Sequence, residues 1–143
     1  MTHGFDTSFL VAAEVLGHPH HAASRERLQS LRSNGDDFAI APQVLAEFIH
    51  VVTDSTRFSQ PLSTANALSR AEAWWTSGEV TQVVPTSATL KEFFEWMRQH
   101  RLGRNRILDT LLAATYKVAG IGSVLTTNAR DFVVFDVFQV IIP

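Results

Sequence analysis

The sequence predicts an α/β fold, a three-layer sandwich with a short-stranded, mainly parallel central sheet flanked by helices. Short apolar segments of strand length alternate with longer segments whose apolar residues recur at helical spacing. The chain of 143 residues is long enough to bury a sizeable core. Its hydrophobic content of 45%, with 18% charged residues, is typical of a globular protein. We therefore expect residues 1–143 to form a single domain.

Composition excludes several classes of function. The chain has no cysteine, which excludes disulfides, zinc-thiolate sites and thiol catalysis. The formal net charge is -2, so a nucleic-acid site would have to be a local basic patch. No apolar run reaches the roughly 20 residues needed to cross a bilayer, and the sequence that follows Met1 does not resemble a signal peptide. We expect a cytoplasmic protein that does not interact with a membrane.

In the first half of the chain, Phe5 begins a very short extended stretch, and Asp6, Thr7 or Ser8 caps the helix that follows. Pro42 begins another helix, where its missing N–H is harmless. The expected helices of this half are 9–16, 22–31, 43–52 and 63–75, and the expected strand is 38–41.

The second half continues the alternation. The expected strands are 80–84, 123–127 and 138–142, and the expected helices run from Ser87 or Thr89 to about His100 and from about residue 104 to 119. Residues 128–132 are expected to form a loop or a single turn. In the last long helix the predicted buried face consists of residues at helical spacing, Ile107, Leu111, Ala114 and Val118, with Leu108, Thr115 and Ala119 beside them. This spacing places Asp109 at the margin of the face.

A partly buried carboxylate such as that of Asp109 is costly unless it is paired, hydrogen-bonded or bound to a metal. Ligands of open parallel sheets bind at the carboxyl ends of the strands. Asp6 follows the first strand, and Asn128 and Asp131 follow the fourth, while Glu47 lies in the helix after the second. Carboxylates brought close together repel one another, and a bound cation neutralises that repulsion. Oxygen ligands favour Mg²⁺ or Mn²⁺, which suits hydrolysis of a phosphodiester bond.

Four segments together resemble a PIN domain, and the chain length resembles the VapC-type toxins of toxin–antitoxin pairs. The segments are 5–10 (FDTSFL), 41–48 (APQVLAEF), 108–114 (LDTLLAA) and 125–132 (LTTNARDF). The resemblance implies a Mg²⁺- or Mn²⁺-dependent endoribonuclease with an RNA substrate, a cognate antitoxin and an acidic pocket formed by Asp6, Glu47 and Asp109. It also implies that Ser8 helps to place the first carboxylate or a water.

The fourth acidic position of the PIN pattern falls on Asn128 in this sequence. An amide oxygen can still coordinate a metal, but it removes one negative charge. Asp131 lies three residues further on and can compensate directly or through a water. Either residue can therefore complete the metal site.

One local basic cluster precedes Asp109. Arg101, Arg104 and Arg106 can hold RNA phosphates beside the metal. Two alternatives are that these arginines serve solubility at a helix end or bind an acidic antitoxin tail. The histidines of 18–21 can be solvated turn residues or metal ligands.

Aromatic residues are more numerous than one small core needs. Some of them can pack internally, and the remainder, in the tryptophan-bearing helices, indicates a homodimer or an antitoxin groove. Two other functions remain open. Because of Asn128, the protein could be a catalytically weak or inactive module that binds RNA or protein. It could also be a structure-specific DNA nuclease.

Overall fold

The computed structural model of the chain describes residues 1–143, and its centre is a five-stranded sheet with the order β3-β2-β1-β4-β5. All four neighbouring pairs run parallel, which confirms the predicted parallel sheet. The strands are β1 (Thr2–Phe5), β2 (Asp37–Ile40), β3 (Val80–Gln82), β4 (Ser123–Leu125) and β5 (Gln139–Ile141).

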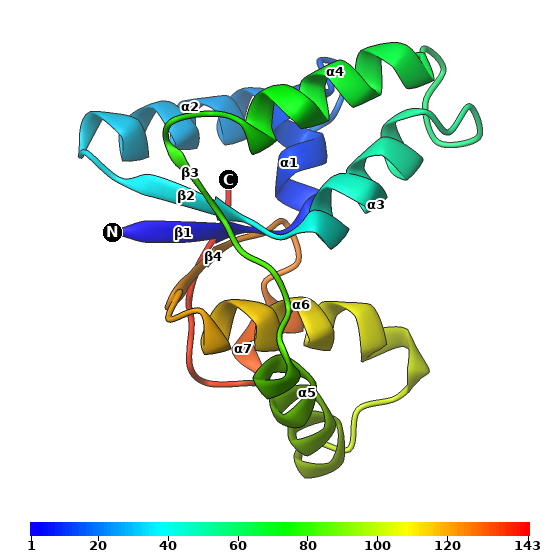
Figure 1. The fold of residues 1–143 in the computed structure, drawn as a ribbon. Coiled ribbons are helices and arrows are strands. Elements are labelled where there is room, and N and C mark those ends of the chain that lie inside the picture. Colours follow the sequence, from blue (N-terminus) through cyan, green and yellow to red (C-terminus); the bar gives the residue numbers. More distant parts are fainter.

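Helices cover both faces of this sheet, as Figure 1 shows, so the predicted three-layer α/β architecture is confirmed. Helices α1 to α4 pack on one another on one side, and α5 to α7 pack on one another on the other side. None of them is both long enough and apolar enough to cross a bilayer. They are α1 (Thr7–Glu14), α2 (His21–Ser33), α3 (Pro42–Val52), α4 (Thr64–Trp75), α5 (Ser87–Gln99), α6 (Ile107–Val118) and α7 (Arg130–Val133), with a 3-10 turn η1 (Arg104–Arg106) before α6.

The first strand begins earlier than the sequence predicts. The expected extended stretch started at Phe5, whereas Phe5 is the last residue of β1. Glycine weakens a strand and so obscured its start, but Gly4 has a specific reason to be there. A Cβ at this position would lie 2.7 Å from the ring of Tyr116, whose hydroxyl donates a 2.6 Å hydrogen bond to the carbonyl of Phe5. The strand can approach α6 this closely only with glycine at residue 4.

The buried face of α6 also differs from the prediction. Ile107 and Val118 are each 40% exposed, although the apolar spacing placed them in the core. Ala114 and Thr115 are buried as predicted, and the other buried residues are Thr110, Leu112, Ala113 and Tyr116. Asp109 is partly buried, in line with Leu112, Ala113 and Tyr116, three, four and seven residues later, so it lies at the margin of the buried face as predicted.

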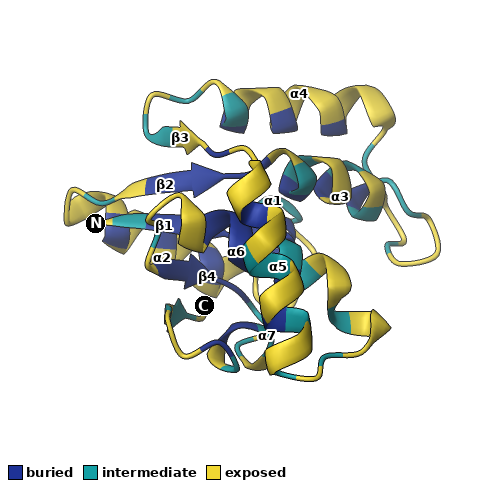
Figure 2. Cartoon of the chain, turned by 60° about the horizontal axis from the view of Figure 1, so that its bottom comes forward, coloured by how far each residue is buried: buried dark blue, intermediate teal, exposed yellow.

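The core lies mainly between the sheet and its two helical layers, as the dark blue segments of Figure 2 show. Two of the three tryptophans pack inside it. Trp74 lies edge-on to Phe5 with ring centroids 5.1 Å apart, and Trp96 stacks on Phe135 at 4.3 Å. Many of the aromatic residues that outnumber the needs of one small core therefore pack against one another inside the chain.

Strand β1 is the topological switch of the sheet. The chain leaves it toward β2 and β3 on one side and later returns to β4 and β5 on the other. At the carboxyl ends of β1 and β4, the N–H of Asp6 donates to the carbonyl of Leu125 at 2.9 Å. The segments that follow these two strands are thereby held side by side, where a ligand site is expected.

Candidate active site

The carboxylate of Asp6 is buried at this switch point, with 6% of the residue exposed. Asp6 occupies the N-cap position of α1, but its side chain accepts no capping hydrogen bond from the helix. One of its oxygens, Oδ2, instead accepts from the hydroxyls of Ser8 at 2.6 Å and Thr126 at 2.7 Å. Two hydroxyl groups therefore fix the orientation of this carboxylate.

The same hydroxyls connect the start of α1, which carries Ser8, to the loop after β4, which carries Thr126. Thr126 Oγ1 accepts from the N–H of Asn128 at 2.9 Å, and Ser8 Oγ accepts from the N–H of Thr127 at 3.0 Å. Ser8 is thus placed next to the first carboxylate, where the PIN resemblance implies it. Thr126 donates to the same oxygen, and sequence reasoning gave this residue no role in the site. The one feature of the sequence that could have indicated such a role is its position at the end of the fourth strand.

Four carboxylates line one cavity of about 360 Å³ at this edge of the sheet. Asp6 comes from the end of β1, Glu47 from α3, Asp109 from the first turn of α6, and Asp131 from α7. Glu47 is exposed, whereas Asp109 and Asp131 are partly buried. We call this space the acidic cavity. Its other lining residues are Thr7, Ser8, Val11, His18, Val51, Arg57, Phe58, Thr127 and Asn128.

Burial, with added repulsion between neighbouring acids, raises the pKa values of three of the acids. Burial raises the pKa of Asp109 to about 6, and the charges of Asp6, Asp131 and Glu47 add to the effect. Burial also raises the pKa of Asp6, although the hydrogen bonds from Ser8 and Thr126 oppose the change. For Glu47, burial and then the charge of Asp6 raise the pKa. The cavity therefore favours a positive partner or a shared proton.

Both alternatives for the fourth position line the acidic cavity. Asn128 is exposed, and its backbone N–H is bonded to Thr126. Asp131 contributes a charge that raises the pKa of Asp6 and Asp109. Arg106 holds Asp131 in place, because its Nη2 donates to the backbone carbonyl of Asp131 at 2.6 Å and its Nε lies 3.8 Å from Oδ1.

The donors of the acidic cavity fit a hard divalent cation by their chemistry. They are carboxylate, amide and hydroxyl oxygens, the ligands that Mg²⁺ and Mn²⁺ prefer. As the side chains stand, no three Asp, Glu or His residues are gathered closely enough to enclose an ion. Magnesium usually keeps several waters and binds only one or two carboxylates, so a closed cage of protein ligands is not required.

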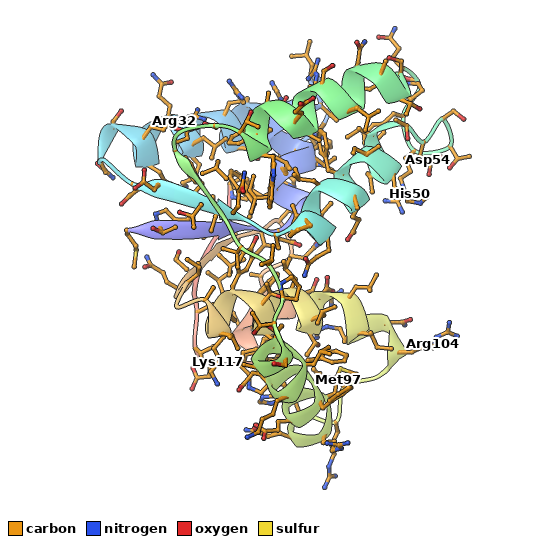
Figure 3. The ribbon with its side chains drawn as sticks, viewed as in Figure 1. Arg32, His50, Asp54, Met97, Arg104 and Lys117 are labelled. Atoms are coloured by element: carbon orange, nitrogen blue, oxygen red, sulfur yellow. The ribbon has the colours of Figure 1, made fainter.

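The predicted phosphate-binding arginines lie apart from the acids. Arg101 and Arg104 do not line the acidic cavity, and Figure 3 shows Arg104 pointing outward beside the start of α6. Arg106 contacts one residue of the acidic cavity, Asp131, and the guanidinium group of Arg106 is engaged by that contact. The cavity is lined instead by His18, one of the histidines of 18–21, and by Arg57, which sequence reasoning did not select.

A serine, a histidine and an aspartate meet at the opposite edge of the sheet. His3 Nδ1 lies 2.7 Å from Ser123 Oγ, and its Nε2 lies 3.4 Å from Asp36 Oδ2. Ser123 is fully buried, with 0% of the residue exposed, so no substrate can reach its hydroxyl. This group is structural, and the acidic cavity is the candidate active site.

Comparisons with known proteins agree with this architecture. No protein-family model matches the sequence, and no curated protein matches it. VapBC2 from Rickettsia felis, bound to a DNA fragment from its promoter, matches with a TM-score of 0.70 at 20% identity, over 100% of this chain and 99% of that one. VapC20 from Mycobacterium tuberculosis, a sarcin-ricin loop cleaving toxin, matches with a TM-score of 0.65 at 20% identity, over 87% of both chains. VapBC-1 from nontypeable Haemophilus influenzae matches with a TM-score of 0.66 at 15% identity, over 99% of this chain and 97% of that one.

The chain has the fold of a PIN domain. More particularly, solved structures that share this fold include VapC toxins and VapBC and FitAB complexes, which are PIN-domain toxin–antitoxin proteins. The resemblance that four sequence segments indicated is confirmed in the fold. The same four segments contribute Asp6, Glu47, Asp109 and Asp131 to the acidic cavity.

Proposed function

We propose that this protein is a metal-dependent endoribonuclease, the cytoplasmic VapC-type toxin of a toxin–antitoxin pair. The observation that supports the proposal most directly is the convergence of four carboxylates on one cavity at the switch point of a PIN fold. Burial, and then the charges of Asp6 and Asp131, raise the pKa of Asp109 to about 6, and a divalent cation would favour its ionised form.

Asp6, Asp109 and Glu47 are the proposed ligands of Mg²⁺ or Mn²⁺, with Asp131 or Asn128 completing the set. The bound ion would polarise the phosphoryl oxygen and lower the pKa of a coordinated water. Ser8 and Thr126 hold the Asp6 carboxylate in one orientation through their 2.6 and 2.7 Å hydrogen bonds. Partial burial and then the charge of Asp6 raise the pKa of Glu47, and a bound cation would offset the repulsion between these two acids.

The test is cleavage of single-stranded RNA in Mg²⁺ or Mn²⁺ by the purified protein. We expect Asp6→Asn and Asp109→Asn to abolish cleavage, because each removes one charge and alters one oxygen donor. Asp136→Asn is the matched control, since Asp136 is exposed, lies outside the acidic cavity and has a φ of 53° that asparagine also adopts. Wild-type activity in either of the first two variants would refute the metal assignment.

A catalytically weak or inactive binding module is the second candidate, and the neutral side chain of Asn128 at the cavity favours it. Calorimetric titration with Mn²⁺ separates the two functions. If no Mn²⁺ binds at millimolar concentration while RNA is still bound, the binding module is the better description. A DNA nuclease would be revealed by a preference for DNA flaps over single-stranded RNA in competition.

Structural neighbours captured as VapBC and FitAB complexes support a cognate antitoxin as the protein partner. Co-purification with the product of a small neighbouring reading frame would test this. The homodimer remains part of the proposal. Because Trp74 and Trp96 are buried, such an interface would use exposed apolar residues of the same helices, such as Leu68 on α4 and Phe94 on α5. Light scattering that reports a monomer at tens of micromolar would contradict it.

A further inference from the structure

A second and larger cavity lies directly beside the acidic cavity. Its volume is about 780 Å³, within the roughly 300–1,000 Å³ typical of ligand sites. It lies between the end of α1, the start of α2 and the connection from α3 to α4. Six of its lining residues matter here: Glu14, His21, Arg25, Arg57, Phe58 and Arg70. We call this space the arginine cavity.

The two cavities share a wall. Arg57 and Phe58, in the connection between α3 and α4, line both of them. Figure 3 labels His50 and Asp54, at and just after the end of α3, where this connection begins. A flexible strand whose reacting group lies in the acidic cavity can therefore pass over Arg57 and Phe58 into the arginine cavity.

Charge is distributed unequally between the cavities. The acidic cavity gathers four carboxylates, whereas the arginine cavity is lined by three arginines and a single carboxylate, Glu14. Side chains of the three arginines, Arg25, Arg57 and Arg70, are 50%, 59% and 43% exposed. Their guanidinium groups can therefore contact a ligand. In a chain of net charge -2, this is a local positive site beside the proposed point of cleavage.

Glu14 and Asp54 leave part of this positive charge available. Glu14 lies 3.2 Å from Arg70 Nη1 and 4.0 Å from Arg25 Nη1, and it also accepts from Trp74 Nε1 at 2.7 Å. One carboxylate is thus divided between two guanidinium groups and an indole. Arg57 pairs with Asp54 at 3.4 Å, outside the lining of the cavity.

Phe58 adds an apolar surface at the shared wall. Its ring is partly buried against the core and lines both cavities. Single-stranded nucleic acids are typically held by cationic groups on the backbone and by aromatic rings on which bases stack. Arg57 and Phe58, adjacent in the chain, provide one of each.

We propose that the RNA strand that enters the acidic cavity continues into the arginine cavity. Arg25, Arg57 and Arg70 hold phosphates of the nucleotides that flank the cleaved bond, and Phe58 stacks on one of their bases. The proposal rests on the ribonuclease function and adds a substrate subsite to it. It differs from the sequence-based prediction, which assigned phosphate binding to Arg101, Arg104 and Arg106.

The test measures binding of a fluorescent single-stranded RNA in EDTA, where no metal-dependent cleavage occurs. Removing one arginine that binds a phosphate should reduce the slope of log K against log salt by about 0.7. We therefore expect the double variant Arg25→Gln/Arg57→Gln to reduce the slope by roughly 1.4. The matched control is Arg27→Gln, because Arg27 is on the same helix but bonds the carbonyl of Ile142 and lies outside the cavity.

Phe58→Leu provides a second, charge-neutral test. It keeps an apolar side chain against the core but removes the stacking surface, so RNA affinity should fall roughly 5- to 100-fold with an unchanged salt slope. An unchanged thermal midpoint of the variant in the absence of RNA verifies folding. RNA carrying 4-thiouridine next to the cleaved position should also crosslink to the segment that contains Arg57 and Phe58.

Wild-type affinity and salt slope in the double variant would overturn the proposal. So would variants that bind RNA normally but lose binding of an acidic peptide or an antitoxin, because the cavity would then serve a protein. In both cases a wild-type protein that cleaves RNA leaves the ribonuclease function intact. A wild-type protein that neither binds nor cleaves RNA would refute that function, and this subsite with it.

Discussion

Asp109 carries a charge at the margin of the buried face of α6. Its position continues the line of Leu112, Ala113 and Tyr116, and burial with the neighbouring acids raises its pKa to about 6. A carboxyl group whose pKa is raised by folding binds its proton more tightly in the folded state. The contribution of Asp109 to the free energy of unfolding is therefore fully present below its ordinary pKa of 3.8. This contribution is lost as the pH rises through about 6.

Asp109→Asn should for this reason stabilise the metal-free protein. We expect the free energy of unfolding to rise by about 1–2 kcal/mol at pH 7.5 and to change little at pH 4, where the folded wild type is already protonated. Urea denaturation in EDTA at both pH values measures the difference. The Asp136→Asn control should show no such dependence. A less stable Asp109→Asn variant at pH 7.5 would contradict the argument.

Thr126 should act through Asp6. Thr126→Val removes the hydroxyl that donates to Asp6 at 2.7 Å and leaves the N–H of Asn128 without its acceptor. We expect a loss of about 1–3 kcal/mol of stability and weaker Mn²⁺ binding, because the carboxylate loses one of its two anchors. Thr126→Ser keeps the hydroxyl and should retain most of both. Equal effects of valine and serine would mean that only packing is involved.

The acids of the site could be found from the sequence, whereas the residues around them could not. Asp6, Glu47, Asp109 and Asp131 each stand beside a strand end or in a helix whose place in a parallel sheet follows from the element order. Arg57 reaches the cavity only because the α3–α4 connection folds back on α1, and no local pattern encodes that path. His18 arrives in a similar way, from the turn between α1 and α2.

At the scale of elements, the packing of β1 on α6 depends on the absence of a side chain at residue 4. Gly4→Ala would place a Cβ 2.7 Å from the ring of Tyr116, which is fully buried and cannot move away easily. We expect a loss of about 1–3 kcal/mol in the free energy of unfolding, the usual effect of overpacking a core.

The prediction is tested by chemical denaturation of Gly4→Ala, with Gly122→Ala as the control. Gly122 precedes β4, and nothing lies within 4 Å of a Cβ placed there. The control should therefore change stability little. Similar losses in both variants would show that backbone freedom, rather than the approach of Tyr116, is what matters at residue 4.

The orientation of α6 shows why one helix face could not be chosen from sequence. Large apolar residues are not confined to one stripe of α6, because Ile107 and Leu111 lie on one side and Leu108 and Leu112 lie on the adjacent side. Periodicity alone therefore supports more than one buried face. The hydrogen bond from the Tyr116 hydroxyl to the carbonyl of Phe5 in β1 fixes one of these faces toward the sheet, and it joins residues 111 positions apart. A tertiary interaction of this range leaves no local signal.

At the scale of the whole molecule, the acidic cavity joins both helical layers to the sheet. Glu47 belongs to α3 on one side of the sheet, Asp109 and Asp131 belong to α6 and α7 on the other, and Asp6 lies between them (Figure 1). The alternation of elements predicted these layers correctly. Their consequence is that any ion bound by these acids connects parts of the chain that are otherwise held by packing.

Mn²⁺ should accordingly raise the thermal midpoint of the protein. A ligand at a hundred times its dissociation constant adds about 2.7 kcal/mol to stability. We expect a saturable upward shift in the wild type and little or none in Asp6→Asn, measured by differential scanning calorimetry. The Thr126→Ser variant should still respond. A wild type whose midpoint is insensitive to Mn²⁺ would contradict metal binding at this cavity.

Glu14 has a position with a further consequence. It holds Arg25 of α2 and Arg70 and Trp74 of α4 against the end of α1. If RNA phosphates use the same two guanidinium groups, substrate and carboxylate compete for them. The internal ion pairs would then lower the affinity for RNA. Tighter RNA binding would be accompanied by weaker contacts between α1, α2 and α4.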